Sequence, residues 1–281
     1  MKSIFLLLFI APGILGLPRK TPRSQRVDSY VINGRDAEYG EFPYMASLQD
    51  SSFGFDYPIC GGAVYNDKFI LTAAHCVNEE NADDPSYLKV YAGDYSLSDI
   101  DGNEQIVPIS EFIIHEDFNK YSMFNDIALL RLQSPLNYTS YVQPILLPSE
   151  EQESSWGQTS NGQTAKILQA VSLPIVSDED CRDVYGNYDV QDSMVCAGGS
   201  GSGGCNGDSG SPLVCDNSGQ LYIAGIGSWG YECATAGFPS VFTEVSYYID
   251  WILQQTKLTQ LILYLLTNVY NHLTFSLELA L

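Results

Sequence analysis

The stretch Cys205-Asn206-Gly207-Asp208-Ser209-Gly210-Ser211-Pro212 places one serine inside a short glycine-rich segment. A serine hydroxyl is a weak nucleophile unless an imidazole takes its proton and a carboxylate holds that imidazole in one tautomer. Two earlier segments supply these groups. Leu71-Thr72-Ala73-Ala74-His75-Cys76 contains a histidine, and Asn125-Asp126-Ile127-Ala128-Leu129-Leu130 contains an aspartate.

The order His75, Asp126, Ser209, each in its own frame, resembles the chymotrypsin/trypsin family of secreted serine endopeptidases. It most resembles the digestive enzymes of crustaceans and other arthropods, over roughly residues 31–256. The resemblance implies that Ser209 is the nucleophile, His75 the general base and Asp126 the group that orients His75. It also implies an oxyanion hole made by the N–H groups of Gly207 and Ser209, protein and peptide substrates, and neither a cofactor nor a metal.

Two other histidines and one other class of protein compete with this interpretation. His115 is interpreted as a strand-end residue, and His272 lies in an atypical tail. A catalytically inactive homologue that acts as a binding cofactor would have lost one of the three residues, and none is lost.

Short apolar runs separated by Gly, Pro, Asn and Asp predict an all-β protein. The family resemblance makes this two six-stranded antiparallel β-barrels with the active site in the cleft between them. We place the N-terminal barrel at about 31–145, the C-terminal barrel at about 146–256, and the crossover near Ser134–Trp156.

A short helix is expected near the end of the domain and is predicted to close the second barrel. Ser246 is its predicted N-cap, and Ile249, Trp251 and Ile252 are predicted to face inward.

The N-terminus is typical of a secretory signal peptide, residues 1–16, because Lys2 precedes the apolar run Ile4–Ile10. Residues 17–30 are then an activation pro-segment. The tail, residues 257–281, is apolar but interrupted by polar residues. It is interpreted as an extension that is processed away or is no part of the natural protein, with a membrane-surface helix or a removed anchor signal as alternatives.

Seven cysteines agree with export to an oxidising compartment. The family resemblance implies three disulfides, listed here by their members: Cys60–Cys76, Cys181–Cys196 and Cys205–Cys233. Cys215 is left over, because its partner in vertebrate relatives would lie near Ala170. It is expected to be a buried free thiol, with a reactive thiol as the alternative.

The charge is strongly negative, with 13 Lys and Arg against 34 Asp and Glu in the whole chain. Residues 1–30 hold five of the basic residues and one acid, so the remainder is more acidic still. Such a surface disfavours nucleic acid and anionic membranes as partners. We interpret the excess of acidic residues as a means of keeping the protein soluble, and the alternative is that it favours cationic substrates.

The family resemblance implies that the protein is made as a zymogen, in which a cut frees a new α-amino group that pairs with the acid before the nucleophile. Here these residues are Val31 and Asp208, and the residue before the cut is Tyr30 rather than the usual Arg or Lys. This predicts an activating protease that cleaves after aromatic residues, such as the enzyme itself. A first cut after Arg26 followed by trimming is the alternative. Protein inhibitors are further expected partners of the monomeric enzyme.

The specificity pocket can be located by the same resemblance. Family members that cleave after Lys or Arg carry an Asp six residues before the nucleophile, and here that residue is Gly203. Gly230 and Ser240 are the expected walls, and Ser240 narrows the interior. Burying Lys or Arg without a carboxylate is unfavourable.

We therefore predict cleavage after Tyr, Phe, Leu or Met, with cleavage after small apolar residues as the alternative. Glu232 at the rim could add tolerance for a cation. Ser228, Trp229 and Gly230 are expected to pair with the substrate backbone, and Ser228 to lie near Asp126.

Three further features carry weaker signals. The acidic loop with Asp94, Asp99, Asp101 and Glu104 has no ligand spacing that defines a calcium site, so it is interpreted as solvated. Asn137 begins the glycosylation sequon Asn-Tyr-Thr. Ser211 stands where family members have Gly, and we expect it to be tolerated.

Overall fold

In the computed structural model the described residues are 34–52, 54–77, 84–97, 100–148, 167–187, 189–204 and 208–257. The predicted signal peptide and pro-segment, Tyr30 and Val31 therefore lie outside the described residues. The same holds for residues 258–281 of the tail and for Cys205 and Gly207.

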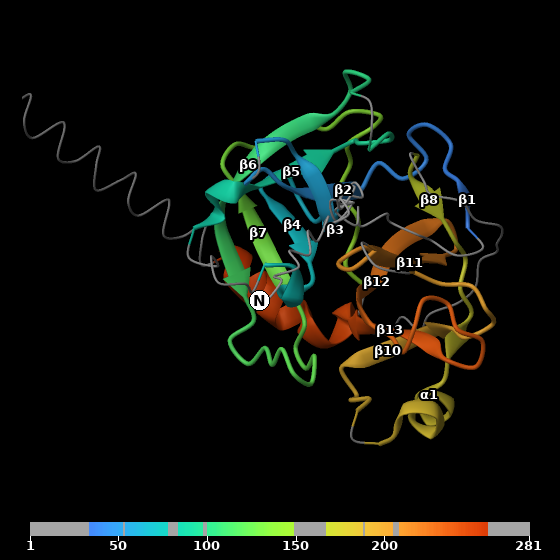
Figure 1. Cartoon of the computed structure of the whole chain (residues 1–281). Coiled ribbons are helices and arrows are strands. Elements are labelled where there is room, and N and C mark those ends of the chain that lie inside the picture. Colours follow the sequence, from blue (N-terminus) through green and yellow to red (C-terminus); the bar gives the residue numbers. More distant parts are fainter. Residues whose placement is uncertain are drawn as a thin grey trace, which may run out of the picture.

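The first half of the chain is a closed barrel of six antiparallel strands (Figure 1). In barrel order these strands are β2 (Met45–Asp50), β3 (Tyr57–Val64), β4 (Phe69–Thr72), β7 (Ala128–Leu132), β6 (Gln105–Ile114) and β5 (Leu88–Ala92). The interior is filled by branched apolar side chains that are fully buried, among them Leu48, Ile70 and Leu129. The prediction of a β-barrel in this half is confirmed.

The second half contains a five-stranded antiparallel sheet beside the barrel (Figure 1). Its order is β11 (Pro212–Asn217), β12 (Gln220–Trp229), β13 (Pro239–Glu244), β10 (Met194–Gly198) and β9 (Ile175–Val176). A separate pair joins β1 (Arg35–Asp36) to β8 (Gln169–Ala170). The described residues thus form a second, partial barrel-like sheet, in agreement with the predicted all-β architecture.

Within the described residues, helical structure is confined to short segments. They are η1 (Ala74–Cys76), η2 (Pro85–Tyr87), α1 (Asp178–Tyr185), η3 (Val245–Tyr248) and a helix over residues 249–257. Ser177 caps α1, because its hydroxyl accepts a hydrogen bond from the N–H of Asp180. None of the helices in the described part of the chain is both long and apolar enough to cross a membrane.

The C-terminal helix exists as predicted, but two details of the prediction are wrong. Ser246 lies inside the 3₁₀ turn η3 rather than at its N-cap, which is Glu244, and its hydroxyl bonds to the Glu244 carboxylate. The helix also packs on the first barrel rather than closing the second, because Trp251 donates to Glu116 and packs against His115.

The largest hydrophobic core contains residues of both halves, and two smaller clusters lie in the second half. Trp251 and Ile252 of the C-terminal helix are buried, Ile249 is half-buried, and Ile223 and Ile226 of β12 join the same cluster as the barrel residues. Residues from both halves can therefore meet at one place with little freedom to shift.

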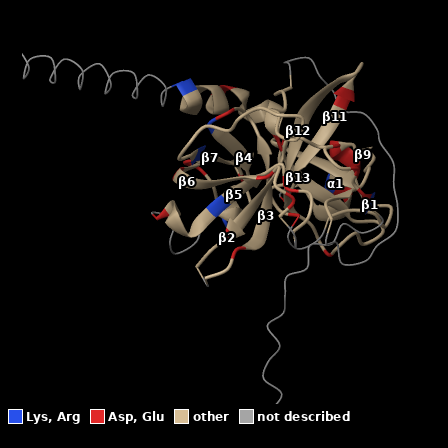
Figure 2. Cartoon of the chain, turned by 90° about the horizontal axis from the view of Figure 1, so that it is seen from above, with Lys and Arg blue, Asp and Glu red and all other residues tan. Residues whose placement is uncertain are grey.

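Four basic side chains in the described part form ion pairs with acids, and further Asp and Glu residues occur along the ribbon of both halves (Figure 2). The ion pairs are Arg35–Glu41, Lys89–Asp56, Arg131–Glu111, and Arg182 with both Asp178 and Asp192. Because the whole chain has 34 Asp and Glu against 13 Lys and Arg, these pairs leave a large excess of negative charge.

Candidate active site

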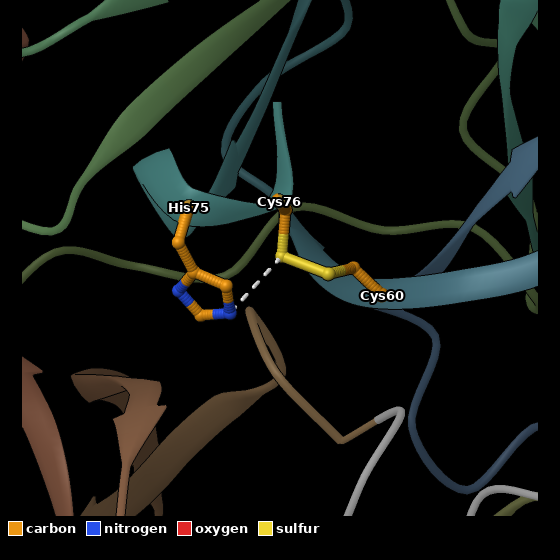
Figure 3. Close-up of side chains that lie close together, drawn as sticks. All are labelled: Cys60, His75 and Cys76. Atoms are coloured by element: carbon orange, nitrogen blue, oxygen red, sulfur yellow. Dashed lines mark hydrogen bonds between the residues drawn. A yellow bond between two sulfur atoms is a disulfide. The ribbon is translucent and has the colours of Figure 1, made fainter. Parts of the chain in front are cut away.

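His75 is held by the chain on both sides. It lies in η1, a 3₁₀ helix of one turn that follows β4. The neighbouring Cys76 is disulfide-bonded to Cys60 of β3 (Figure 3). Figure 3 also shows the imidazole beside this disulfide, with Nε2 3.9 Å from the Cys76 sulfur. The disulfide fixes the turn, so the direction of the His75 side chain is set by the barrel.

Asp126 is completely buried and directs its carboxylate at His75. Oδ2 lies 2.7 Å from His75 Nδ1, and Oδ1 accepts a hydrogen bond of 2.8 Å from the His75 backbone N–H. The hydroxyl of Ser228 also donates to Oδ2, at 2.5 Å, which confirms the expected position of Ser228. With a carboxylate on Nδ1, the neutral imidazole keeps its proton there and offers Nε2 as the proton acceptor.

Ser209 enters the site on a tight turn. Its carbonyl accepts a 2.7 Å hydrogen bond from the N–H of Gly61 in β3, next to the Cys60 disulfide. Gly210 follows with φ +76° and donates its N–H to the carbonyl of Gly227. The turn that carries Ser209 is therefore bonded to both halves of the molecule.

A cavity of about 540 Å³ opens beside Ser209. Its lining includes the predicted residues Ser228, Trp229, Gly230 and Ser240, together with Gly204. The structure thus brings four of the five predicted substrate-binding residues, all but Gly203, to the same cavity as Ser209.

The interior of this cavity is narrowed by Ser240. A β-carbon built at Gly203 would lie 3.2 Å from the Ser240 hydroxyl oxygen, so these two residues face each other closely. Gly203 itself is buried, and its neighbour Gly204 lines the cavity in its place. Two acids also line the cavity: Asp208, next to Ser209, and the exposed Glu232.

A second cavity, of about 420 Å³, lies between the two halves. Asp208 lines it as well, opposite apolar groups such as Tyr44 and Leu213. Asp208 is thus shared by the two cavities, together with Gly204 and Phe242.

The disulfide predictions are confirmed where they fall in the described residues. Cys60–Cys76 and Cys181–Cys196 are formed. Cys233 is also disulfide-bonded, and its expected partner Cys205 lies outside the described residues. Cys215 is free and buried, as expected.

One group of described residues lies close enough to hold a metal ion, namely Cys60, His75 and Cys76. Its sulfurs are joined in a disulfide and offer no thiolate, so the group is unsuited to a metal. In the acidic loop, Glu104 accepts hydrogen bonds from the N–H groups of Asp101 and Gly102. Its carboxylate thereby shapes the turn itself.

Sequence reasoning missed the residues that bond to the backbone of Asp126 and to its neighbour Asn125. Thr243 donates its hydroxyl to the Asp126 carbonyl at 2.8 Å, and Tyr248 donates to the side chain of Asn125 at 2.8 Å. These partners lie 117 and 123 residues apart in the chain. No local pattern connects them, so only the folded chain reveals the contacts.

Two features together define a serine peptidase site. His75 is clamped by a disulfide and bonded at Nδ1 to the buried Asp126, and Ser209 lines a cavity on a tight turn that is bonded to β3, the strand of the same disulfide. The two β-structured halves around it define the two-barrel class. The family model described as trypsin matches residues 31–252, and the chain belongs to this family as a serine endopeptidase.

Three relatives illustrate this membership. Trypsin-1 of Astacus astacus is 44% identical, over 79% of this chain and 98% of the relative. Phenoloxidase-activating factor 3 of Holotrichia diomphalia is 35% identical, over 86% of this chain and 76% of the relative. Coagulation factor XI of Bos taurus is 34% identical, over 83% of this chain but 39% of that longer protein.

Proposed function

We propose that this chain is a secreted digestive endopeptidase, made as a zymogen, that cleaves after large apolar residues through Ser209, His75 and Asp126. The observation that carries the proposal is the bonding of His75 Nδ1 to the buried Asp126, beside a cavity whose inner wall is the uncharged Ser240.

In the proposed reaction, Ser209 Oγ attacks the carbonyl carbon of the scissile bond and its proton moves to His75 Nε2. The carbonyl oxygen becomes an oxyanion that accepts from the N–H groups of Gly207 and Ser209. The C–N bond then breaks, and the leaving amine takes the proton from His75. Water then gives a proton to His75 Nε2 while its oxygen attacks the acyl carbon. The bond from that carbon to Ser209 Oγ breaks, and Oγ takes the proton back from His75, which regenerates the serine.

Ser240 and the glycines around it support the proposed specificity. Gly230 leaves the entrance open, because a β-carbon there would find its nearest contact at 3.9 Å. The interior places a hydroxyl, not a carboxylate, opposite Gly203. A Lys or Arg side chain would be desolvated there without a counter-charge from Ser240 or Gly203. Of the two acids that line the cavity, Glu232 is exposed and Asp208 is proposed below to pair with the Val31 ammonium.

The narrowing by Ser240 favours one alternative, cleavage after small apolar residues such as Ala or Val. The difference between the two preferences rests on a few methylene groups, so each is expected to be broad rather than absolute.

Activation is proposed to follow cleavage after Tyr30 by this enzyme or a similar one. The new ammonium of Val31 would pair with Asp208, and the cavity beside Asp208 leaves room for an apolar N-terminal side chain. N-terminal sequencing of the active form tests this step. A terminus at Val31 is expected, whereas a terminus at Val27 would contradict the proposal.

Several broader features belong to the same proposal. Residues 1–16 would direct export, 17–30 would be the pro-segment, 31–256 the protease domain, and 257–281 an extension without a role in catalysis. The acidic surface suits a soluble monomer that meets proteins, an activating protease and protein inhibitors rather than nucleic acid.

The test is hydrolysis of matched peptides that differ only in the residue before the cut, with Ser209→Ala as the inactive control. We expect fast cleavage after Phe, Tyr or Leu and little after Arg. Fast cleavage after Arg would overturn the proposed specificity and would point to Asp208 or Glu232 as the counter-charge. Equal activity of Ser209→Ala would overturn the proposed mechanism.

A further inference from the structure

The final segment of the domain reaches back to the turn that carries Asp126. Thr243, the penultimate residue of β13, donates its buried hydroxyl to the Asp126 carbonyl at 2.8 Å. Tyr248, the last residue of η3, donates to Asn125 Oδ1 at 2.8 Å. Two consecutive residues of the turn are thus held by two hydroxyls from the other end of the chain.

Asn125 needs such support because of its backbone conformation. Its φ is +56°, in the left-handed region, which Asn adopts more readily than most residues with a side chain but which is uncommon even so. Both ends of its carboxamide are used: Nδ2 donates to the Asp117 carbonyl at 2.9 Å, and Oδ1 accepts from Tyr248. The Asn125 carbonyl in turn accepts from the N–H of Ile127 at 2.9 Å.

The direction of the Asp126 carboxylate depends on this turn. The carboxylate has no exposure to solvent and makes its bonds to His75 and Ser228 from a fixed backbone. A displacement of about 1 Å at a catalytic group can lower a rate about 10²-fold. A small displacement of residues 125–126 would therefore change the orientation of His75.

Tyr248 is well suited to hold the turn. Its side chain is buried, and burial raises the pKa of its hydroxyl, so the proton that it donates to Asn125 is retained across the working pH range. Its backbone belongs to a segment that is anchored in the shared core by Val245 and Ile252. The hydroxyl therefore has a fixed position relative to the first barrel.

We propose that Tyr248 and Thr243 are positioning residues of the peptidase reaction, which hold the Asn125–Asp126 turn so that Asp126 keeps His75 in its reactive orientation. The proposal rests on the roles proposed above for Asp126 and His75. It adds that β13 and η3, which belong to the second half, set the orientation of Asp126 and His75, which belong to the first half.

The test compares Tyr248→Phe with Tyr247→Phe in the activated full-length enzyme. Tyr247 is a matched control, because it is the exposed neighbour of Tyr248 and its ring contact with Tyr248 survives the change. Turnover is expressed per active site titrated with a burst substrate, which removes any unfolded fraction from the comparison.

For Tyr248→Phe we expect kcat to fall about tenfold with KM within about twofold, an effect the size of one hydrogen bond to a polar network. The acid side of its pH–rate profile should move to lower pH, because a less well held Asp126 stabilises the protonated imidazole less. Tyr247→Phe should match the wild type in both respects.

Thr243 gives an independent pair of variants. Thr243→Val keeps the shape of the side chain but removes the hydroxyl, and Thr243→Ser keeps the hydroxyl. We expect a loss of kcat in the first and its rescue in the second. This pair also decides the question if Tyr248→Phe does not fold.

The inference is overturned if Tyr248→Phe and Thr243→Val lower the melting temperature but leave kcat and the pH–rate profile unchanged. Asp126→Asn separates this result from a failure of the proposed mechanism. Wild-type activity of Asp126→Asn would overturn the proposed roles of Asp126 and His75, and the inference with them. An inactive Asp126→Asn beside unchanged positioning variants would overturn the inference alone.

Discussion

Gly210 lies directly against the side chain of Thr72, so that a β-carbon at residue 210 would be 2.3 Å from Thr72 Oγ1. The same β-carbon would lie 2.5 Å from the carbonyl oxygen of Gly61, to which Thr72 donates its hydroxyl. The turn after Ser209 is thus packed on the first barrel without space for any side chain.

Gly210→Ala should therefore destabilise the protein by at least about 3 kcal/mol and remove most activity, since strain at φ +76° adds to the clash. Thermal unfolding and peptide hydrolysis measure the two effects.

Gly219→Ala is the matched control for this prediction. Gly219 also has positive φ, +91°, but a β-carbon there would meet nothing within 4 Å. Gly219→Ala should lower the free energy of unfolding by about 1 kcal/mol and leave activity intact. Equal effects of the two changes would show that backbone strain alone, rather than contact with Thr72, decides the outcome.

Ser228→Ala should lower kcat by about 10- to 100-fold, because Asp126 loses one of its hydrogen bonds while both bonds to His75 remain. Asp126→Asn should cost far more, on the order of 10⁴, which is the size of this change in the reaction that defines the class. Steady-state kinetics of both variants, with the exposed Ser110→Ala as control, make the comparison. A loss in Ser228→Ala as large as that in Asp126→Asn would contradict the ranking.

Ser240→Gly should widen the interior of the specificity cavity, because the Ser240 hydroxyl faces Gly203 at close range. The ratio of kcat/KM for Phe over Ala before the cut is expected to rise about tenfold. Peptide substrates measure the ratio, and Ser218→Gly on the distant β11–β12 turn is the control. An unchanged ratio would mean that Ser240 does not limit the size of the bound side chain.

Asp94→Asn should stabilise the protein at neutral pH. Burial first, and then the nearby charges of Glu104 and Asp101, raise the pKa of Asp94 from 3.8 to about 6. The folded state therefore binds this proton more tightly than the unfolded state, so stability is lost as the pH rises from about 4 through about 6. Asp94→Asn removes this charge, so it should raise the free energy of unfolding by about 2–3 kcal/mol at pH 7 and leave it unchanged at pH 4.

Urea unfolding of Asp94→Asn at both pH values, in a chelator, checks this prediction. The chelator prevents a cation from occupying the acidic loop, which would reverse the sign by stabilising the ionised carboxylate. The exposed Asp183→Asn is the control and should show no such dependence. A gain that is equal at pH 4 and pH 7 would contradict the assigned cause.

The sequence by itself determined the class of the protein and its principal groups. His75, Asp126 and Ser209 stand in local frames that can be recognised without the fold, and the alternation of short apolar runs with turn residues predicted the β-architecture. The cysteine assignments within the described residues were also predictable, because family membership fixes which positions carry them.

The tertiary structure alone decided how these groups are held. Thr243 and Tyr248 meet the Asp126 turn across more than a hundred residues, and the C-terminal helix packs on the first barrel instead of the second. The sequence prediction of Ser246 as a cap failed for a related reason, since the chain enters a 3₁₀ turn already at Val245, whose side chain is buried in the shared core. Local patterns report propensity, whereas such contacts depend on which surfaces the whole chain brings together.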